Sequence, residues 1–230
     1  MEINKTSKYW GERLLQSLIV LLPTYLVRFE IAGIRLNVLD VVVVVSFLTC
    51  ILLYRQARLG VLCMGIWKYI MGSFAIIGLI AVIISANTMA ALGLYKSYII
   101  APMLVGIMVL TIRPRLEAIL QAFALLIVFI GTIGIWQLLT GYGIPAPWNI
   151  PGDEFRITSV YDYPNAVGLT LAPLLALLAA HLLQRGTHKQ WFLPIFLLGC
   201  LAVVWSRSDG AVVAVFAAVA SCLLFTRWRW

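Results

Sequence analysis

Charged residues are scarce in this sequence, and their scarcity excludes an ordinary soluble domain. Only 11% of the 230 residues are Asp, Glu, Lys or Arg, whereas 63% are hydrophobic and the mean hydropathy is +1.00. A soluble domain of this length needs a charged surface. Apolar runs that approach or exceed the roughly 20 residues needed to cross a bilayer recur along the chain. The composition therefore predicts an all-α, polytopic helical membrane protein.

Residues that commonly bind metals are also few. The sequence has two His and four Cys, no C-x-x-C pair, and its cysteines lie in or beside apolar runs, as small packing residues do. An H-E-x-x-H motif, a P-loop and a nucleophile elbow are absent as well. We therefore expect no metal site. The net charge of +8 is spread over the ends of apolar segments, so nucleic acid is not an expected partner.

Eight apolar segments are predicted to be transmembrane helices. They cover residues 14–27, 36–54, 67–86, 92–112, 116–140, 165–184, 191–205 and 209–226. The first and the seventh are shorter than a full crossing usually requires. The β-branched run 41–45 is not expected to form a strand, because an open sheet leaves backbone groups unpaired in lipid. We expect residues 1–230 to form a single transmembrane domain.

The basic residues predict the orientation of these helices. With both termini in the cytoplasm, twelve of the 17 Lys and Arg residues fall on the cytoplasmic side, as the positive-inside rule requires. A seven-span alternative would place Arg227 and Arg229 outside and break this pattern. The five cations on the outer side are Arg28, Arg35, Lys96, Arg156 and Arg207.

One dense polar segment, residues 156–165, interrupts the apolar chain. Pro164 suits the first turn of a helix, because the N–H that it lacks has no helical partner there. Asp162 is a plausible cap for that helix. Arg156 lies just upstream, and a cation beside the positive end of a helix dipole favours a bound anion, above all phosphate. The alternative for Arg156 is an ion pair with the acidic residues 153–154.

A second polar break, residues 206–210 (Ser-Arg-Ser-Asp-Gly), separates the last two predicted spans. Ser208 or Asp209 is suited to cap the following helix, so a second helix N-terminus faces the outer side beside Arg207. The alternative for Arg207 is an ion pair with Asp209 or Asp162. The arginine fork matches phosphate oxygens, so the two breaks together predict a diphosphate site beside a hydrocarbon interior.

Lys96 is the remaining outer cation with a possible function. It lies near the start of the fourth predicted span, where it either snorkels to the interface or projects into a central cavity. Asp40 is expected to be a structural counter-ion for Lys96 or Arg35. Among the tryptophans, we expect interface anchoring for most, and only Trp148 is placed where it could stack on a sugar.

Small residues predict close packing of two spans. The last span carries Gly210, Ala214, Ala218 and Cys222 at four-residue spacing, a stripe that lets helices approach. Gly131 and Gly134 in the fifth span indicate the same.

With these residues the sequence resembles the O-antigen ligase and O-antigen polymerase superfamily of bacterial membrane glycosyltransferases. The resemblance rests on residues 134–137 (Gly-Ile-Trp-Gln), 156–159 (Arg-Ile-Thr-Ser), 163–165 (Tyr-Pro-Asn) and 206–207 (Ser-Arg), with 21–23 (Leu-Leu-Pro) and 39–40 (Leu-Asp) nearer the start. Their order and spacing cover essentially the whole chain, which would match the N-terminal portion of such a protein.

This resemblance implies a function at the outer face of the bacterial inner membrane. Members transfer glycans from undecaprenyl diphosphate to a lipid or glycan acceptor, and they need no metal and no other cofactor. The implied partners are a polyprenyl-diphosphate-linked glycan and the bilayer; no catalytic residue is assigned. The resemblance implies that Arg156 and Arg207 hold the diphosphate. From their own chemistry Asn165 and Lys96 are added as candidates for the same role, with Asp40, Asp162, Ser206 and Asp209 in support.

The sequence departs from the family at its end. The family's large outer loop supplies another arginine and a candidate catalytic histidine, and it would follow the last span, but this sequence ends at Trp230. A second hypothesis is therefore a catalytically incomplete relative, or a subunit that binds the carrier lipid and takes the missing loop from a partner chain. A small transporter is the third hypothesis; only Lys96 favours it, because no pair of spans is broken by Gly or Pro at mid-bilayer.

Overall fold

The computed structural model of this chain describes residues 5–31, 34–54, 65–150, 155–183 and 190–227, which form two compact units. Unit 1 comprises Met1–Ile119 and unit 2 comprises Leu120–Trp230. Most of the described residues are helical, and their strands form one two-stranded sheet. The all-α fold class is therefore confirmed, and eight helices are present in the described ranges.

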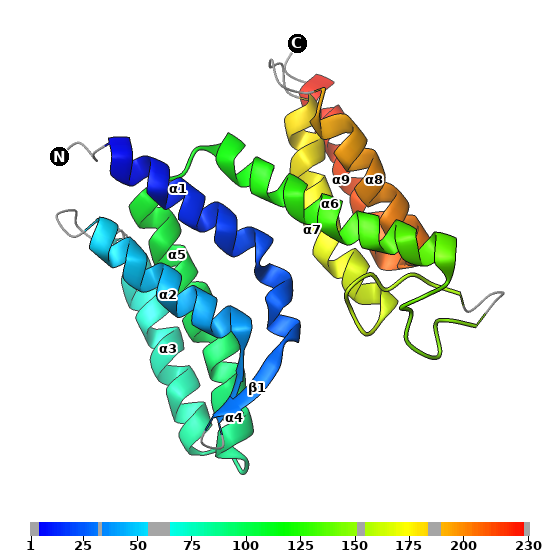
Figure 1. Cartoon of the computed structure of the whole chain (residues 1–230). Coiled ribbons are helices and arrows are strands. Elements are labelled where there is room, and N and C mark those ends of the chain that lie inside the picture. The colour runs from blue at the N-terminus through cyan, green and yellow to red at the C-terminus, as the bar shows by residue number, and fades with distance from the viewer. Residues whose placement is uncertain (1–4, 32–33, 55–64, 151–154, 184–189, 228–230) are drawn as a thin grey trace. The chain divides into compact units, whose positions relative to one another are not determined.

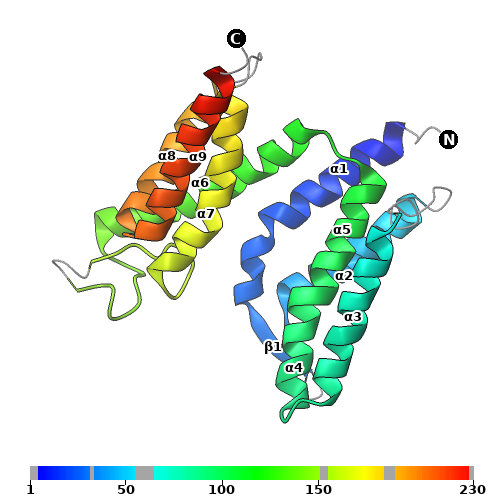
Figure 2. The same cartoon turned by 180° about the vertical axis from the view of Figure 1, so that it is seen from behind.

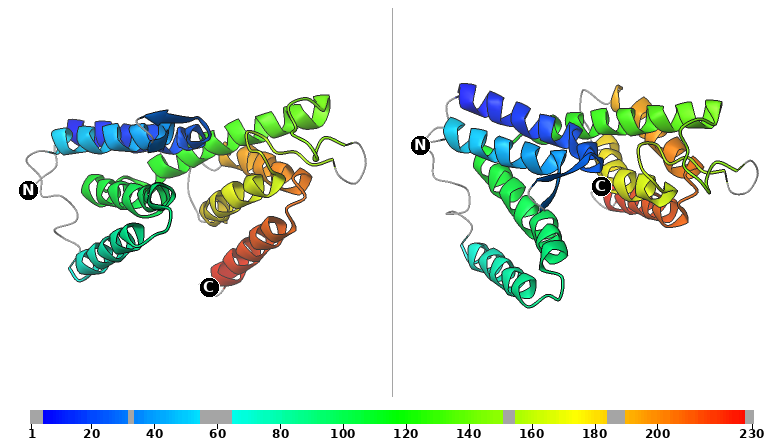
Figure 3. Two further views of the ribbon diagram at one scale, coloured as in Figure 1. Left: turned by 90° about the horizontal axis from the view of Figure 1, so that it is seen from below. Right: turned by 60° about the horizontal axis from the view of Figure 1, so that its bottom comes forward.

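Unit 1 is a helical bundle with a small β-hairpin. It opens with α1 (Lys5–Val20) and the 3₁₀ turn η1 (Leu22–Leu26), and the antiparallel strands β1 (Arg28–Ile31) and β2 (Ile34–Asn37) follow. Next come α2 (Val38–Leu53), α3 (Trp67–Ile83) and one continuous helix made of α4 (Thr88–Tyr95), the π-helical turn η3 (Lys96–Ile100) and α5 (Ala101–Ile112). Within this unit α1 and α2 lie side by side (Figures 1 and 3).

The core of unit 1 lies where α1, α2 and α5 meet. Leu15 and Leu18 are one turn apart, so they share the face of α1 that packs inward. The buried cluster consists of Leu15, Leu18, Val43, Cys50, Tyr54, Met108 and Ile112. The Tyr54 hydroxyl donates to the carbonyl oxygen of Ser7 at 3.1 Å, which ties the end of α2 to the start of α1.

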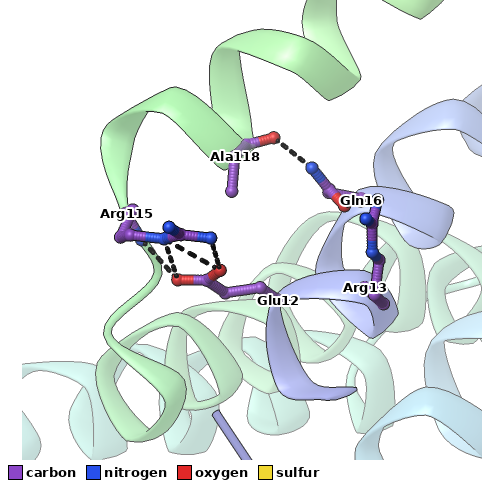
Figure 4. Close-up of polar contacts among 5 residues, drawn as sticks. All are labelled: Glu12, Arg13, Gln16, Arg115 and Ala118. Carbon is purple, nitrogen blue, oxygen red and sulfur yellow. Dashed lines mark hydrogen bonds and ion pairs between the residues drawn. The ribbon is translucent and has the colours of Figure 1, made fainter. Parts of the chain in front are cut away.

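A buried carboxylate fixes α1 to the connector between α5 and α6. Glu12 is 4% exposed and accepts hydrogen bonds from the Arg115 backbone N at 3.0 Å and from Arg115 Nη2 at 2.9 Å (Figure 4). One turn on, Gln16 Nε2 donates to the carbonyl oxygen of Ala118 at 2.9 Å. Burial raises the pKa of Glu12, but the hydrogen bonds and charge of Arg115, aided by Lys8, outweigh burial and hold that pKa below its ordinary value. The same pairing raises the pKa of Arg115.

The described residues of unit 2 contain four helices, and a long connection separates the first from the second. Helix α6 (Leu116–Thr140) begins in the last residues of unit 1, and α7 (Pro164–Leu183), α8 (Phe192–Trp205) and α9 (Asp209–Arg227) follow the loop. Helix α7 packs against both α8 and α9 (Figure 2).

Glycines bring helices of unit 2 into close contact. A Cβ on Gly199 would lie 2.7 Å from Leu175 and 2.9 Å from Ile127, and a Cβ on Gly131 would lie 2.8 Å from Leu198. No such Cβ fits, so these positions let α8 approach α6 and α7 directly. The prediction of close packing is thereby confirmed for Gly131.

Helix lengths correct the prediction of eight spans. In the described ranges, three helices are long and apolar enough to cross a membrane: Thr88–Ile112, Leu116–Thr140 and Pro164–Leu183. Four further apolar helices are shorter: Val38–Leu53, Trp67–Ile83, Phe192–Trp205 and Asp209–Leu224. Helix α8, for example, has 14 residues and is about 21 Å long, less than the roughly 30 Å of bilayer hydrocarbon. The described part of the chain therefore has three helices of spanning length and not eight.

The predicted first span, 14–27, is the least accurate. Helix α1 begins at Lys5 and ends at Val20, and the chain then forms η1 with Pro23 at its start. Proline ends the α-helix because it cannot donate the required hydrogen bond. The residues after η1 form a hairpin, in which Arg28 pairs with Asn37. By contrast α6 has the predicted boundaries, and the run 41–45 is helical as expected.

Candidate functional site

A buried glutamine on α6 holds the backbone of the polar segment that was predicted to be functional. Gln137 is 1% exposed, and its Oε1 accepts from the backbone N–H groups of Thr158 at 3.0 Å and Ser159 at 2.7 Å. Its Nε2 donates to the carbonyl oxygens of Gly143 and Ser159, both at 2.8 Å. One amide side chain therefore pairs four backbone groups, and the three in residues 158–159 would otherwise be buried without partners.

The residues around this amide reinforce the same placement. Ser159 adopts a left-handed backbone conformation, with φ of 53°, and its hydroxyl donates to the carbonyl oxygen of Ile130 at 2.8 Å. Ile157 is fully buried and lies against Gly134, where an added Cβ would come within 2.8 Å of Ile157 Cδ1. The segment 157–159 is thus packed directly onto α6. The small residue Gly134 therefore admits a loop side chain, whereas close packing against another helix was predicted there.

Arg156 joins three parts of unit 2 at one point. Its Nε donates to the carbonyl oxygen of Ser206 at 2.9 Å, and its Nη2 donates to the carbonyl oxygen of Arg207 at 2.7 Å and to Asn165 Oδ1 at 2.9 Å. The guanidinium lies 5.1 Å from the centre of the Trp148 ring, a cation–π distance. These bonds use three of the five N–H donors of an arginine. Among the described residues Nη1 has no hydrogen-bond partner.

The second polar break forms a tight turn between α8 and α9. Arg207 adopts a left-handed backbone conformation, with φ of 49°, and its exposed side chain projects from this turn. Ser206 is fully buried and its hydroxyl donates to Val203. The carbonyl oxygen of Ser208 accepts from the backbone N of Ala211 at 2.9 Å, so α9 begins here, as expected.

The N-terminal ends of α7 and α9 lie against each other. A Cβ on Gly168 would lie 2.4 Å from Ser208 Oγ and 2.6 Å from the Cβ of Ala211. Arg156 bonds to Asn165, in the first turn of α7, and to Arg207, just before α9. The two helices therefore begin at the same end of unit 2 and run in the same direction, so the positive ends of both helix dipoles meet at this point.

A groove with a volume of about 570 Å³ opens between these two helices. Its polar end lies at the helix N-termini and its apolar part follows the two helices away from them. The residues that line it are Arg156, Asn165, Arg207, Ser208, Asp209, Gly168, Leu169, Ala172, Pro173, Gly210, Ala211 and Ala214. The structure therefore brings four of the predicted site residues, Arg156, Asn165, Arg207 and Asp209, into one groove.

Two predictions near the groove need correction. In the stripe on α9, Gly210 and Ala214 are exposed and line the groove, and a Cβ on Gly210 would meet no atom within 4 Å. The tight contact with α7 is made by the neighbouring face, at Ala211. Asp162 is exposed and lies two residues before α7; it does not line the groove. The residue directly before the helix is Tyr163, whose carbonyl oxygen accepts from Ala166 at 3.2 Å.

Lys96 and Asp40 lie together in unit 1. Lys96 Nζ forms an ion pair with Asp40 Oδ2 and also donates to the carbonyl oxygen of Arg35 at 3.2 Å. Asp40 has a second role, because its carboxylate accepts from the backbone N of Asn37 at 2.8 Å while Asn37 caps α2 in return, a capping box. The expected structural pairing of Asp40 is confirmed. The alternative partners of Arg156, residues 153–154, lie outside the described residues.

Sequence reasoning did not find the role of Gln137. It entered the prediction only as the last residue of the 134–137 motif. A usable signal was present, since a glutamine deep in a predicted span needs partners for both ends of its amide. Trp148 was expected either to anchor at the interface or to stack on a sugar, whereas the structure places its ring against Arg156.

Comparison with known proteins adds no independent identification. No family model matches this sequence, and neither a curated protein nor a solved structure matches it.

Proposed function

We propose that this chain is an O-antigen ligase- or polymerase-like membrane protein that binds a polyprenyl-diphosphate-linked glycan in the groove between α7 and α9. The observation that carries the proposal is the shared groove of Arg156, Asn165 and Arg207. Its polar end combines two arginines with two helix N-termini, and its remaining lining is largely apolar. This order of polar and apolar surface matches a lipid that carries a diphosphate headgroup.

The two arginines contribute differently. Arg207 presents its exposed side chain to the groove and supplies most of the positive charge for a phosphate. Arg156 is bonded to Ser206, Arg207 and Asn165, so it fixes the turn that presents Arg207 and offers Nη1 to the ligand. Lys96 belongs to an ion pair in unit 1, and we therefore leave it out of the site.

In the transfer reaction these cations stabilise the leaving group. The oxygen of an acceptor hydroxyl bonds to the anomeric carbon of the carried glycan. The bond from that carbon to the diphosphate oxygen breaks and leaves its electron pair on the diphosphate, while the hydroxyl proton passes to water. Negative charge grows on the diphosphate during this step, and nearby fixed cations lower its energy.

Membrane placement follows from the same proposal. The three long apolar helices cross the bacterial inner membrane, and the groove lies toward its outer face. Most of the 17 basic residues lie at the ends of apolar segments that are assigned to the cytoplasmic side, which supports this orientation.

A second function, binding of the carrier lipid without catalysis, is favoured by the lining of the groove. Among the described residues that line it, Asp209 is the single carboxylate, and none is a histidine. His181 lies in the last turn of α7, at the far end of that helix from the groove's polar end. A general base would then come from a partner chain that carries the outer loop.

Substitution of Arg207 by Ala tests the proposal. In cells that depend on this chain, Arg207→Ala should abolish the glycan product while the amount of protein in the membrane stays unchanged. Arg28→Ala, which removes an exposed arginine from β1 in unit 1, is the matched control and should leave the product unchanged. An unaltered product with Arg207→Ala would refute the proposed site.

Binding of undecaprenyl diphosphate to the purified chain separates the two functions. Both require binding that is lost in Arg207→Ala. If the wild-type chain binds this lipid but transfers no glycan without a partner, the carrier-binding function is correct. If it does not bind the lipid at all, both functions are wrong.

A further inference from the structure

The first half of α1 presents a basic and aromatic surface that the groove in unit 2 does not use. We define the α1 surface as Lys8, Tyr9, Trp10 and Arg13, all of which are exposed. Tyr9 is 49% and Trp10 is 55% exposed. The opposite side of the same helix is buried in the core of unit 1 through Leu15 and Leu18. A helix with these two faces has a second surface that is suited to a partner.

Three side chains of the α1 surface form one patch. The guanidinium of Arg13 lies 5.2 Å from the centre of the Tyr9 ring, and the rings of Tyr9 and Trp10 meet edge to face with centroids 5.5 Å apart. Lys8 adds a second exposed cation in the same half of the helix, on the side of Glu12. Large rings next to Lys and Arg are typical of residues at the level of lipid headgroups, where the rings contact apolar chains and the cations stay wet.

The positive charge of this surface exceeds the negative charge of the helix. Glu12 is the only acidic residue in α1, and it is buried and bonded to Arg115. Its carboxylate also attracts Lys8, one turn earlier, but its hydrogen bonds are made to Arg115. The exposed surface keeps the charges of Lys8 and Arg13, so its complement is an anionic partner.

The same combination recurs at the start of α3. Trp67 is 63% and Tyr69 is 69% exposed, and Lys68 Nζ lies 5.0 Å from the centre of the Tyr69 ring. The starts of α1 and α3 lie toward the same end of unit 1 (Figures 1 and 2). Two cation–aromatic groups at one end of a helical bundle match a single planar surface, such as a leaflet.

We propose that the α1 surface binds the headgroups of anionic phospholipids in one leaflet of the membrane. Each Lys or Arg close to an anionic bilayer adds about 1 kcal/mol of attraction, which corresponds to roughly a 5-fold preference per cation. Lys8 and Arg13 together therefore select anionic over zwitterionic lipid by roughly 25-fold. Tyr9 and Trp10 fix the depth at which the cations meet the headgroups.

Native mass spectrometry of the full chain tests this proposal. The chain is released from nanodiscs made of equal parts phosphatidylglycerol and phosphatidylcholine, and the retained lipids are counted. The double variant Lys8→Gln/Arg13→Gln should lower the ratio of retained phosphatidylglycerol to phosphatidylcholine by roughly 25-fold. The matched control is Arg28→Gln/Arg35→Gln, which removes two exposed cations from the hairpin of the same unit and should keep the wild-type ratio.

Each other result overturns the proposal. An unchanged ratio in Lys8→Gln/Arg13→Gln excludes lipid binding by this patch, and an equal decrease in both double variants shows only an effect of net charge. Loss of a co-purifying protein at an unchanged lipid ratio assigns the surface to a protein partner instead. If the double variant does not fold, Arg13→Gln alone is measured, with a 5-fold decrease expected. The lipid ratio does not depend on glycan transfer, so this test stands apart from that of the groove.

Discussion

The substitution Gln137→Leu should release the segment that carries Arg156. Gln137 is 1% exposed and pairs with the backbone of Gly143, Thr158 and Ser159 through both atoms of its amide. Leucine has a similar size and fits the same space, so the main change is the loss of these hydrogen bonds. The variant therefore isolates the contribution of one polar group.

The expected cost follows from the groups that lose their partner. The N–H groups of Thr158 and Ser159 would be left buried without an acceptor, and each such group costs about 1–3 kcal/mol. The free energy of unfolding should therefore fall by about 2–6 kcal/mol. A stable domain has only about 5–15 kcal/mol in total, so the segment 157–159 would open well before the helices separate.

Hydrogen–deuterium exchange followed by mass spectrometry measures this opening. Amides of residues 157–159 should exchange at least about 30-fold faster in Gln137→Leu, the factor that corresponds to 2 kcal/mol. Thr132→Val is the control, because it also removes a polar group from α6, but the Thr132 hydroxyl bonds only to its own helix, at the carbonyl oxygen of Val128. If Gln137→Leu exchanges no faster than Thr132→Val in this segment, the anchoring role of Gln137 is refuted.

Two further predictions concern packing and pH. Gly168→Ala should destabilise unit 2 by about 1–3 kcal/mol, because the added Cβ would lie 2.4 Å from Ser208 Oγ. In the same thermal-unfolding measurement Gly210→Ala should be neutral, because a Cβ there meets nothing within 4 Å. Equal effects of the two substitutions would contradict the close contact at Gly168. The pKa of Glu12 is lower in the folded chain than its ordinary value, so its ion pair stabilises unit 1 above the ordinary carboxyl pKa, and this stabilisation is lost as the pH falls through the lowered folded pKa. Unfolding of the wild type should become easier through that acidic range, whereas Glu12→Gln should be less stable at neutral pH and lack this part of the pH dependence; identical pH profiles would exclude the pair as the cause.

Helices and their polar ends could be predicted from sequence because both depend on local chemistry. Pro164 and the 206–210 break begin α7 and α9 as expected, since proline suits a first turn and a short polar run ends an apolar helix. The pairing of Asp40 with Lys96 was also foreseen, because a charge at a helix end in an apolar chain needs a partner. Arg156 and Arg207 were predicted to meet because the polar segments 156–165 and 206–210 each precede the N-terminus of a helix on the same side.

The remaining features depend on contacts between distant residues, which periodicity does not show. The apolar run after Arg13 suggested a span, but Pro23 and the hairpin end α1 at Val20. The small residues of α9 were predicted to contact another helix through Gly210. The contact with α7 is instead made by the next residue, Ala211, which lies against Gly168. The bonds of Gln137 join residues more than twenty positions apart, and only the folded chain brings them together.

The hydrogen bond from the Arg156 backbone N to the carbonyl oxygen of Trp148, at 3.1 Å, holds these two residues together at the polar end of the groove. Extra residues placed at the exposed position Ile150 would leave this bond in place. An epitope tag inserted there would show, by antibody binding to intact spheroplasts, whether the groove faces the outer side of the membrane.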